Sequence, residues 1–274
     1  MESLILDLFG RVFARADIFV SVSPGMTAKF RASGIPPERV REIPNGVDLR
    51  RFRPASSPDE VRALRAKLGL PTRGPIIVFV GFFSRDKAPH VLFQAWRRLP
   101  PGPERPFLLL IGSTDPRHVE VDAGIVTEIR SAIDRGNLHD RVGFVEATNA
   151  VEEYLRAANI YVAPSRREGL SNALLEALAC GLAVVAARIE GVTTGVIADG
   201  RSGMLVAPDD PVALAERLQA LLDDESLRRT LGREARRLAE SRYGIEAVAG
   251  KYLELYRELL AKGGSGRTRT RVTA

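Results

Sequence analysis

The chain has 274 residues, of which 45% are hydrophobic and 27% are charged, and its formal net charge at pH 7 is +6. This length allows a substantial core in one large or two small domains, and no apolar run approaches the roughly 18 residues of a transmembrane helix. The arginines that make the chain basic are interleaved with Asp and Glu on predicted helices. They therefore indicate solvated helix faces, and we expect no nucleic-acid partner.

Two features of the sequence indicate the compartment. The N-terminus lacks the basic start and cleavage site of a secretory signal, and the single Cys180 lies at an Ala-rich helix end, where a small core residue fits. Both features favour the reducing cytoplasm. Residues 263–274 are rich in glycine and arginine, so we predict a disordered tail. Its attraction to acidic lipid leaves peripheral contact with the inner membrane face open as an alternative.

The first elements of the chain are short. Residues 4–14 carry an apolar stripe at helical spacing, which indicates a helix packed on its neighbours, with a role at a membrane surface as the alternative. A strand at 17–23, a helix at 25–33 and a second strand at 40–44 follow. The edges of this strand pair need a cover, which a partner chain could provide.

From residue 75 onward, strands and helices alternate regularly. Strands are predicted at 76–80, 107–111, 142–145, 160–163 and 183–187, and helices at 90–99, 126–134, 151–158 and 172–179. Alternation of this kind predicts an α/β fold with a doubly wound, Rossmann-like parallel sheet and right-handed crossovers. Amphipathic helices at 211–223 and 227–241 and a last helix at 243–260 complete the chain.

Two carboxylates lie eight residues apart across a predicted loop-to-helix junction. Glu168 follows a short apolar strand, Ser171 or Asn172 is a suitable N-cap, and Glu176 lies one to two turns into the helix. The amides of a first helical turn carry the positive end of the helix dipole and can hold phosphate. A phosphate site between two carboxylates suits a ligand with hydroxyls at both ends, such as a sugar nucleotide. The alternative is an ordinary solvated first turn.

A second candidate site residue is Lys87, in the loop between the strand at 76–80 and the helix at 90–99. Loops at the carboxyl ends of parallel strands are where ligands bind in such sheets. A flexible ammonium group in this place can neutralise a diphosphate. The alternative is an ordinary surface lysine.

Glu168, Glu176 and their seven intervening residues resemble the paired-glutamate signature of the retaining GT-B glycosyltransferases of the family 4 type. Other segments resemble motifs of this family in the same order. They are the linker at 44–48 with Phe52 and Pro54, the donor-phosphate loop at 80–87, the strand near the base at 141–145 and the closing hairpin at 199–206. The resemblance covers roughly residues 18–261.

The resemblance implies the C-terminal half of a GT-B fold with a remnant of the N-terminal half. Residues 1–47 would be the remnant of the acceptor domain plus the linker, and 48–245 the donor-binding, Rossmann-like domain. Residues 246–262 would form a cross-over helix that braces the N-terminal part, and 263–274 the basic tail. A full acceptor domain should have on the order of 150 residues or more.

The resemblance also implies roles for individual residues. Glu168 is the catalytic residue and contacts the transferred sugar, as a nucleophile, as an anchor for its hydroxyls or as an electrostatic stabiliser, while Glu176 binds the ribose hydroxyls. The donor phosphates are held by a set of loop residues, and the base lies near the strand at 141–145. The phosphate-binding set is Gly81, Arg85, Lys87, Gly169, Leu170 and Ser171, and the residues near the base are Phe144 and Val145. We expect no cofactor and no metal, because Lys87 and the helix terminus can offset the leaving charge.

Two positions depart from the family pattern. Phe82 stands where many members have an arginine, so Arg85 is expected to substitute for it. In the loop at 190–195, Thr194 takes the place of a glutamate, and acidic help from that loop is not expected.

The function that follows is transfer of a sugar, with retention, from a nucleoside diphosphate to an unknown acceptor, as in polysaccharide or glycolipid biosynthesis. One alternative is a non-catalytic nucleotide-sugar-binding subunit, or a truncated remnant, that needs a separate acceptor-domain chain. A nucleotide-sugar epimerase is disfavoured by the motif order. The base, the sugar, the acceptor and the oligomeric state cannot be read from the sequence.

Overall fold

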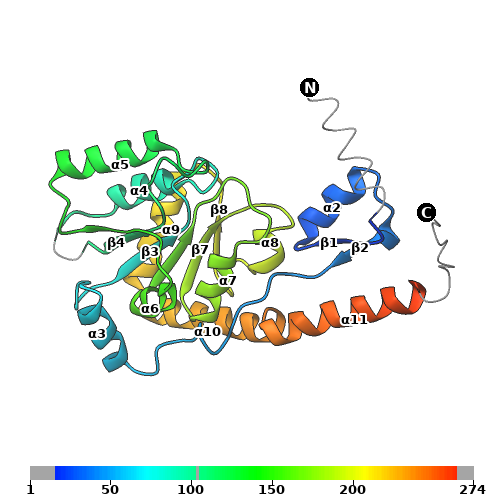
Figure 1. The fold of residues 1–274 in the computed structure, drawn as a ribbon. Helices are drawn as coiled ribbons and strands as arrows, with labels where there is room; N and C mark the ends of the chain where they lie inside the picture. The colour runs from blue at the N-terminus through cyan, green and yellow to red at the C-terminus, as the bar shows by residue number, and fades with distance from the viewer. Residues whose placement is uncertain (1–15, 103–104, 264–274) are drawn as a thin grey trace.

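A computed structural model describes residues 16–102 and 105–263 (Figure 1). The helix predicted at residues 4–14 and the basic tail beyond Gly263 lie outside the described residues. None of the helices in the described part has the length and hydrophobicity that are needed to span a bilayer.

The larger part of the molecule is built on a six-stranded sheet in which every pair of neighbours is parallel. Its strands, in spatial order, are β5 (Val142–Val145), β4 (Phe107–Ile111), β3 (Ile76–Val80), β6 (Ile160–Ala163), β7 (Ala183–Ala187) and β8 (Met204–Val206). The predicted doubly wound parallel sheet is confirmed. The strand order reverses between β3 and β6, and at such a switch point the loops after the two strands diverge and leave a crevice.

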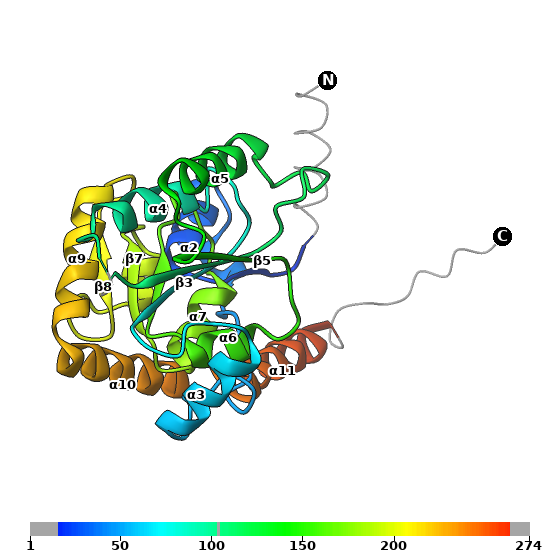
Figure 2. The same cartoon turned by 90° about the vertical axis from the view of Figure 1, so that its left-hand side faces the viewer.

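Helices cover both faces of this sheet (Figure 2). One face packs against α4 (Pro89–Arg98), α5 (Ala123–Gly136) and α9 (Pro211–Asp223). The other face packs against α3 (Pro58–Lys67), α6 (Val151–Ala157), α7 (Asn172–Ala179) and α10 (Glu225–Arg242). In β3, Ile77 and Phe79 belong to the first core and Ile76 and Val78 to the second. Burial on both faces explains why these strands read as continuous apolar runs.

The N-terminal part forms a small unit of its own beside the large sheet (Figure 1). It contains β1 (Phe19–Ser21), α2 (Pro24–Ala32), the short 3-10 helix η1 (Pro37–Arg39) and β2 (Val40–Glu42), and β1 pairs with β2 in parallel. The last helix, α11 (Ile245–Gly263), runs back to this unit and packs Val248 and Leu255 against Ile43.

The connection between the two parts crosses at one place. Val47 donates to the carbonyl of Tyr243 at 2.7 Å and accepts from Ile245 at 3.0 Å. The linker and the start of α11 therefore run side by side. The predicted domain boundaries at residues 47 and 245 lie at this crossing and stay predictions.

A short helix lies where a loop was expected. Residues 190–195 were expected to form a loop, and the structure contains the one-turn helix α8 (Thr193–Val196) there. The Thr193 hydroxyl accepts from the Ile189 amide at 2.7 Å and donates to the Ala187 carbonyl at 2.7 Å. This buried side chain closes the turn, and such local hydrogen bonds leave little signal in hydrophobic periodicity.

Candidate functional site

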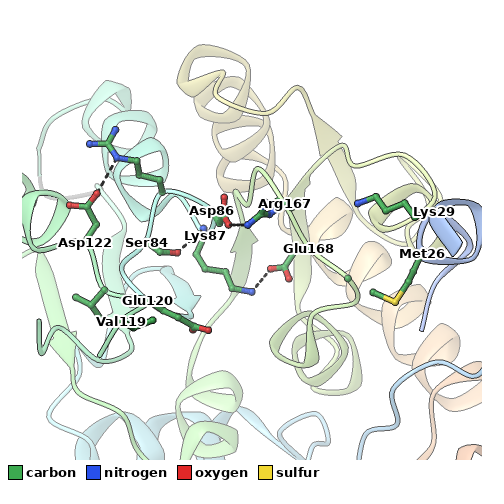
Figure 3. A pocket seen from close by; sticks show the side chains of 13 residues that line it. Met26, Lys29, Ser84, Asp86, Lys87, Val119, Glu120, Asp122, Arg167 and Glu168 are labelled. Atoms are coloured by element: carbon green, nitrogen blue, oxygen red, sulfur yellow. Dashed lines mark hydrogen bonds and ion pairs between the residues drawn. The ribbon is translucent and has the colours of Figure 1, made fainter. Parts of the chain in front are cut away.

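A cavity of about 890 Å³ lies beside the carboxyl ends of β3 and β6 (Figure 3). Four segments line it: residues 84–87 after β3, residues 119–122 before α5, residues 167–169 after β6, and Met26 with Lys29 from α2. The cavity therefore lies between the large sheet and the N-terminal unit. Its location agrees with the switch point, where the loops after β3 and β6 diverge.

An ion pair connects the two sides of the switch point. Lys87 Nζ lies 2.6 Å from Glu168 Oε1, and the Ser165 hydroxyl donates to the same oxygen at 3.0 Å. The side chain of Glu168 is only 10% exposed and that of Lys87 29%. Since charges attract more strongly where water is excluded, this pair holds both side chains in defined positions.

Backbone and side-chain contacts fasten the loop after β3 to the loop after β6. The Arg166 amide donates to the Asp86 carbonyl at 2.8 Å, and the Arg167 guanidinium lies 2.7 Å from the Asp86 carboxylate. Ala88, directly after Lys87, is buried in the left-handed conformation with φ 52°. That conformation costs a non-glycine residue about 1–2 kcal/mol. The surrounding core holds it, and the chain turns there into α4.

The start of α7 has the expected cap and free backbone donors. The Ser171 hydroxyl accepts from the Leu174 amide at 3.3 Å, which confirms one of the two predicted N-caps. In the part of the chain that the structure describes, no group accepts a hydrogen bond from the amides of Gly169, Leu170 or Ser171. Of these three residues, Gly169 lines the cavity, and Leu170 and Ser171 follow it outside the lining.

Glu176 is the fifth residue of α7 and has a different environment from Glu168. Its pKa is raised above the ordinary value, chiefly by burial, against the lowering effect of the nearby Arg51 charge. No side chain in the described ranges donates to its carboxylate. Glu176 does not line the large cavity. The charges of Glu168 and Glu176 nevertheless both affect the buried hydroxyl of Tyr161. The pKa of the Tyr161 hydroxyl is raised by burial and then by the charges of Glu168 and Glu176.

The remaining predicted residues are divided between the cavity and its surroundings. Arg85 lines the cavity and pairs with Asp122 at 3.0 Å. Phe144 and Val145 lie in β5 outside the lining, where the Phe144 ring stacks on Phe83 with centroids 5.7 Å apart. The Phe144 ring is thus held by Phe83, and both Phe144 and Val145 are only partly buried.

Gly81 lies outside the lining, where β3 closely approaches β4. A Cβ on Gly112, whose φ is +153°, would lie 1.9 Å from the Gly81 carbonyl oxygen. No side chain fits between the two backbones at this position. The close approach of Gly81 and Gly112 therefore fixes the distance between the starts of the loops that follow β3 and β4.

Sequence reasoning missed the wall that α2 provides and the segment 119–122. Met26 and Lys29 line the cavity from a helix about 60 residues ahead of Lys87 in the chain. Neither carries a motif, so periodicity and spacing could not find them. Asp122 had a usable signal, because it is the N-cap of α5 and accepts from Gly124 at 2.9 Å.

The described residues contain no group of three or more His, Cys, Asp or Glu side chains arranged to hold a metal ion. The cavity is lined by three cations that are each paired with a carboxylate: Lys87, whose side chain is largely shielded, and the exposed Arg85 and Arg167. Such an arrangement can exchange an internal anion for an external one, as phosphate-binding sites do.

Two family models match the chain. The model described as glycosyl transferases group 1 matches residues 60–238, and the model described as glycosyltransferase family 4 matches residues 1–51. Among curated relatives, a D-inositol 3-phosphate glycosyltransferase from Xylanimonas cellulosilytica is 34% identical over 90% of this chain and 60% of its own length. The alpha-maltose-1-phosphate synthase of Mycolicibacterium smegmatis is 33% identical over 90% of this chain and 64% of its own. The chain thus spans about 60% of the length of these relatives.

Solved structures agree in fold. The sucrose-phosphate synthase of Thermosynechococcus elongatus superposes with a TM-score of 0.79 at 34% identity and covers 90% of this chain and 59% of its own. Anabaena Alr3699/HepE in complex with UDP and glucose superposes with a TM-score of 0.78 at 22% identity, over 88% of this chain and 63% of its own. At that lower identity the likeness concerns the fold alone.

Proposed function

The chain belongs to the group 1 glycosyl transferases, and we propose that it is the donor-binding part of a retaining glycosyltransferase. The sugar would come from a nucleoside diphosphate and pass to an acceptor with retention of configuration. The observation that carries this proposal is the contact between Lys87 and Glu168 at the switch point of the sheet, next to the free amides of residues 169–171, which directly precede α7. Support comes also from the relatives named as glycosyltransferases and from the solved structure of similar fold that contains UDP and glucose.

The diphosphate is proposed to lie between Lys87 and the amides of Gly169, Leu170 and Ser171. The negative charge of the diphosphate would compete with Glu168 for the ammonium group of Lys87. Lys87 would then pair with the phosphate and stabilise the negative charge that develops on the leaving oxygen. Preorganised donors aimed at a developing charge are among the largest contributions to catalysis. Lys87 already lines the cavity before the donor arrives, so only its side chain has to turn from Glu168 to the phosphate.

Glu168 is then free to act on the transferred sugar. Ser165 keeps a hydrogen bond to Oε1, so the carboxylate stays oriented after Lys87 has turned to the phosphate. A carboxylate at this place stabilises the positive charge of an oxocarbenium-like transition state, whether or not it forms a covalent bond. Lys87 and the amides of residues 169–171 offset the opposite charge, so we propose that the reaction needs no metal ion.

Glu176 is proposed to bind the ribose. Both of its carboxylate oxygens lack a side-chain donor among the described residues, and its raised pKa reports a group that burial has left short of partners. A vicinal diol donates two hydrogen bonds and fits two such oxygens. The backbone of Phe144 and Val145 is proposed to lie near the base.

The second candidate function is a nucleotide-sugar-binding subunit that acts only with a separate acceptor-domain chain. Among the described residues of the N-terminal unit, only Met26 and Lys29 of α2 line the cavity. An acceptor would therefore meet few residues of this unit, and a separate acceptor-domain chain could supply the others. Both candidate functions predict that the chain binds the sugar nucleotide, but only the first predicts that the chain alone transfers the sugar. As part of the proposal we place the chain in the cytoplasm, since the free Cys180 is buried and suits a reducing compartment.

The test is turnover of sugar nucleotides by the purified chain, alone and with candidate acceptors, followed by the anomeric configuration of the product by NMR. Glu168→Gln should retain donor affinity and lose about 100- to 1,000-fold in turnover, as when one electrostatic stabiliser is removed. Lys67→Gln is the matched control, because Lys67 pairs with Glu153 on the surface at 2.7 Å. Inversion of configuration, or equal turnover in Glu168→Gln, would refute the proposed role. Donor binding without turnover in any assay would favour the second candidate.

A further inference from the structure

The charged residues that line the large cavity are almost completely paired. They comprise four cations and four carboxylates: Lys29, Arg85, Lys87, Arg167, Asp86, Glu120, Asp122 and Glu168. Three ion pairs use six of these residues, joining the loops after β3 and β6 to each other and to residue 122. Within the described ranges, Lys29 and Glu120 are the two that remain without a partner.

Lys29 lies on the wall of the cavity that α2 forms. In Figure 3 its side chain extends from α2 towards the cavity, on the far side of Glu168 from Lys87. The two lysines therefore line the cavity from different elements, Lys87 from the loop after β3 and Lys29 from α2. An anion bound by Lys29 would lie across the transferred sugar from the diphosphate.

Close backbone contacts hold α2 against the large domain. The Gly25 amide donates to the Gly191 carbonyl at 2.8 Å, and a Cβ on Gly191 would lie 2.6 Å from the Gly25 nitrogen. Near the same end of the helix, a Cβ on Gly169 would lie 3.3 Å from the Met26 methyl group. Lys29, one turn further along α2, thus extends from a positioned element, which is what a binding residue needs.

The proposed binding site of the sugar nucleotide does not include the side of the cavity that α2 forms. The proposed phosphate donors lie at the start of α7, the proposed ribose site is deeper in α7 at Glu176, and the proposed base site is at β5. An acceptor must reach the sugar from another direction, and α2 forms the wall there. A free cation on that wall selects for negative charge, and the unpaired Glu120 on the other wall repels it.

We propose that Lys29 binds a negatively charged group of the acceptor, a phosphate ester or a carboxylate. The inference rests on the proposed function, because it takes the donor site as given and names the class of acceptor. Lys29 contributes a single charge at an exposed position, so its loss should weaken acceptor binding by about tenfold and leave donor binding unchanged.

The five lysines of the chain allow a direct test. Reductive methylation with ¹³C-formaldehyde keeps the charge of each lysine and gives it one NMR signal, and Lys29→Arg and Lys87→Arg assign the two that matter. UDP, GDP and ADP are titrated first. Glucose 6-phosphate, glucuronate, glucose and inorganic phosphate are then titrated onto the chain with the nucleotide that bound.

The expected result is that a nucleoside diphosphate shifts the Lys87 signal and leaves Lys29 in place. Glucose 6-phosphate or glucuronate, but not glucose, should then shift Lys29, and the two arms tell a phosphate from a carboxylate. Arg31→Gln, which removes a charge from α2 outside the cavity lining, should not change this response.

Three outcomes would overturn the inference. If the nucleotide alone shifted the Lys29 signal, Lys29 would belong to the site of the sugar donor. If inorganic phosphate shifted the signal as much as glucose 6-phosphate and glucuronate do, Lys29 would be a site for any anion. It would have no such role if none of the four compounds shifted it. Failure of the proposed function is a separate result, because Lys87 would then respond to no nucleotide whatever Lys29 does.

Discussion

Replacement of Glu176 by glutamine is expected to stabilise the fold and to weaken nucleotide binding. Burial raises the pKa of Glu176 in the folded protein above its value in the unfolded chain. The folded state therefore holds this proton more tightly, and the ionised side chain reduces stability as the pH rises from the unfolded pKa through the folded one. Glutamine has no charge to bury. At pH 7.5 the variant should gain about 0.5–2 kcal/mol of unfolding free energy, as replacements at strained functional positions commonly do.

The loss of binding follows from the two free carboxylate oxygens. Glutamine keeps one acceptor oxygen and replaces the other by a donor, so one charge-assisted hydrogen bond to the ribose is lost. Such a bond contributes about 1.5–3 kcal/mol. The dissociation constant should rise roughly 10- to 100-fold, since 1.4 kcal/mol corresponds to a factor of ten.

The assay combines thermal unfolding at pH 4 and pH 7.5 with calorimetric titration of the nucleotide. The Glu176→Gln variant should melt about 2–4 °C higher for each kcal/mol gained at pH 7.5, and the difference should shrink at pH 4. Glu152→Gln is the control. Burial is the largest single effect on the pKa of Glu152 and raises it, but the hydrogen bonds and the charges of Arg51 and Arg156 together lower it further. The net pKa is therefore lowered, and loss of this carboxylate should destabilise the fold. A lower melting temperature at pH 7.5 for Glu176→Gln, together with unchanged affinity, would refute the reasoning.

Three further predictions concern the framework of the site. Gly112→Ala should lower the unfolding free energy, measured in urea, by about 3 kcal/mol, because its Cβ would meet the Gly81 carbonyl oxygen. The control Gly34→Ala, at φ +82° with open space around it, should cost about 1 kcal/mol. Equal costs for the two variants would contradict the close approach of the two backbones. Ser171→Ala should cost about 1 kcal/mol of stability by thermal denaturation through loss of the α7 cap, and no loss would speak against that cap. Burial raises the pKa of Cys180 to about 12, so a thiol reagent at pH 8 should react with it only after unfolding, and rapid reaction of the folded chain would disprove its burial.

Much of the fold could be predicted from local patterns. The five strands from residue 76 to residue 187 have the predicted bounds, because each is a continuous apolar run that a polar residue, a glycine or, for β6, Pro164 ends. Helix ends were less accurate. Helix α5 starts at Ala123, three residues before the prediction, since Asp122 caps it from a polar segment that breaks the apolar pattern. The strand order and the position of α2 depend on contacts between distant segments, which no local pattern contains.

The candidate site divides in the same way. Lys87 and Glu168 could be found because each follows a strand of a parallel sheet, and the structure brings their side chains into contact. Their proposed roles stay predictions. Lys29 could not be found, since its importance arises only when α2 is placed against the loop after β7 through Gly25 and Gly191. The resemblance to family motifs covered the donor side and carried no information about this wall.

The most direct test of the account is calorimetric titration of the folded chain with UDP, GDP and ADP. The account predicts that one of these nucleotides binds at a single site, that Lys87→Gln weakens this binding at least tenfold, and that Lys67→Gln leaves it unchanged. Absence of binding for all three nucleotides in a chain shown to be folded, or equal affinity in Lys87→Gln, would contradict the central claim that this cavity holds the diphosphate of a sugar donor.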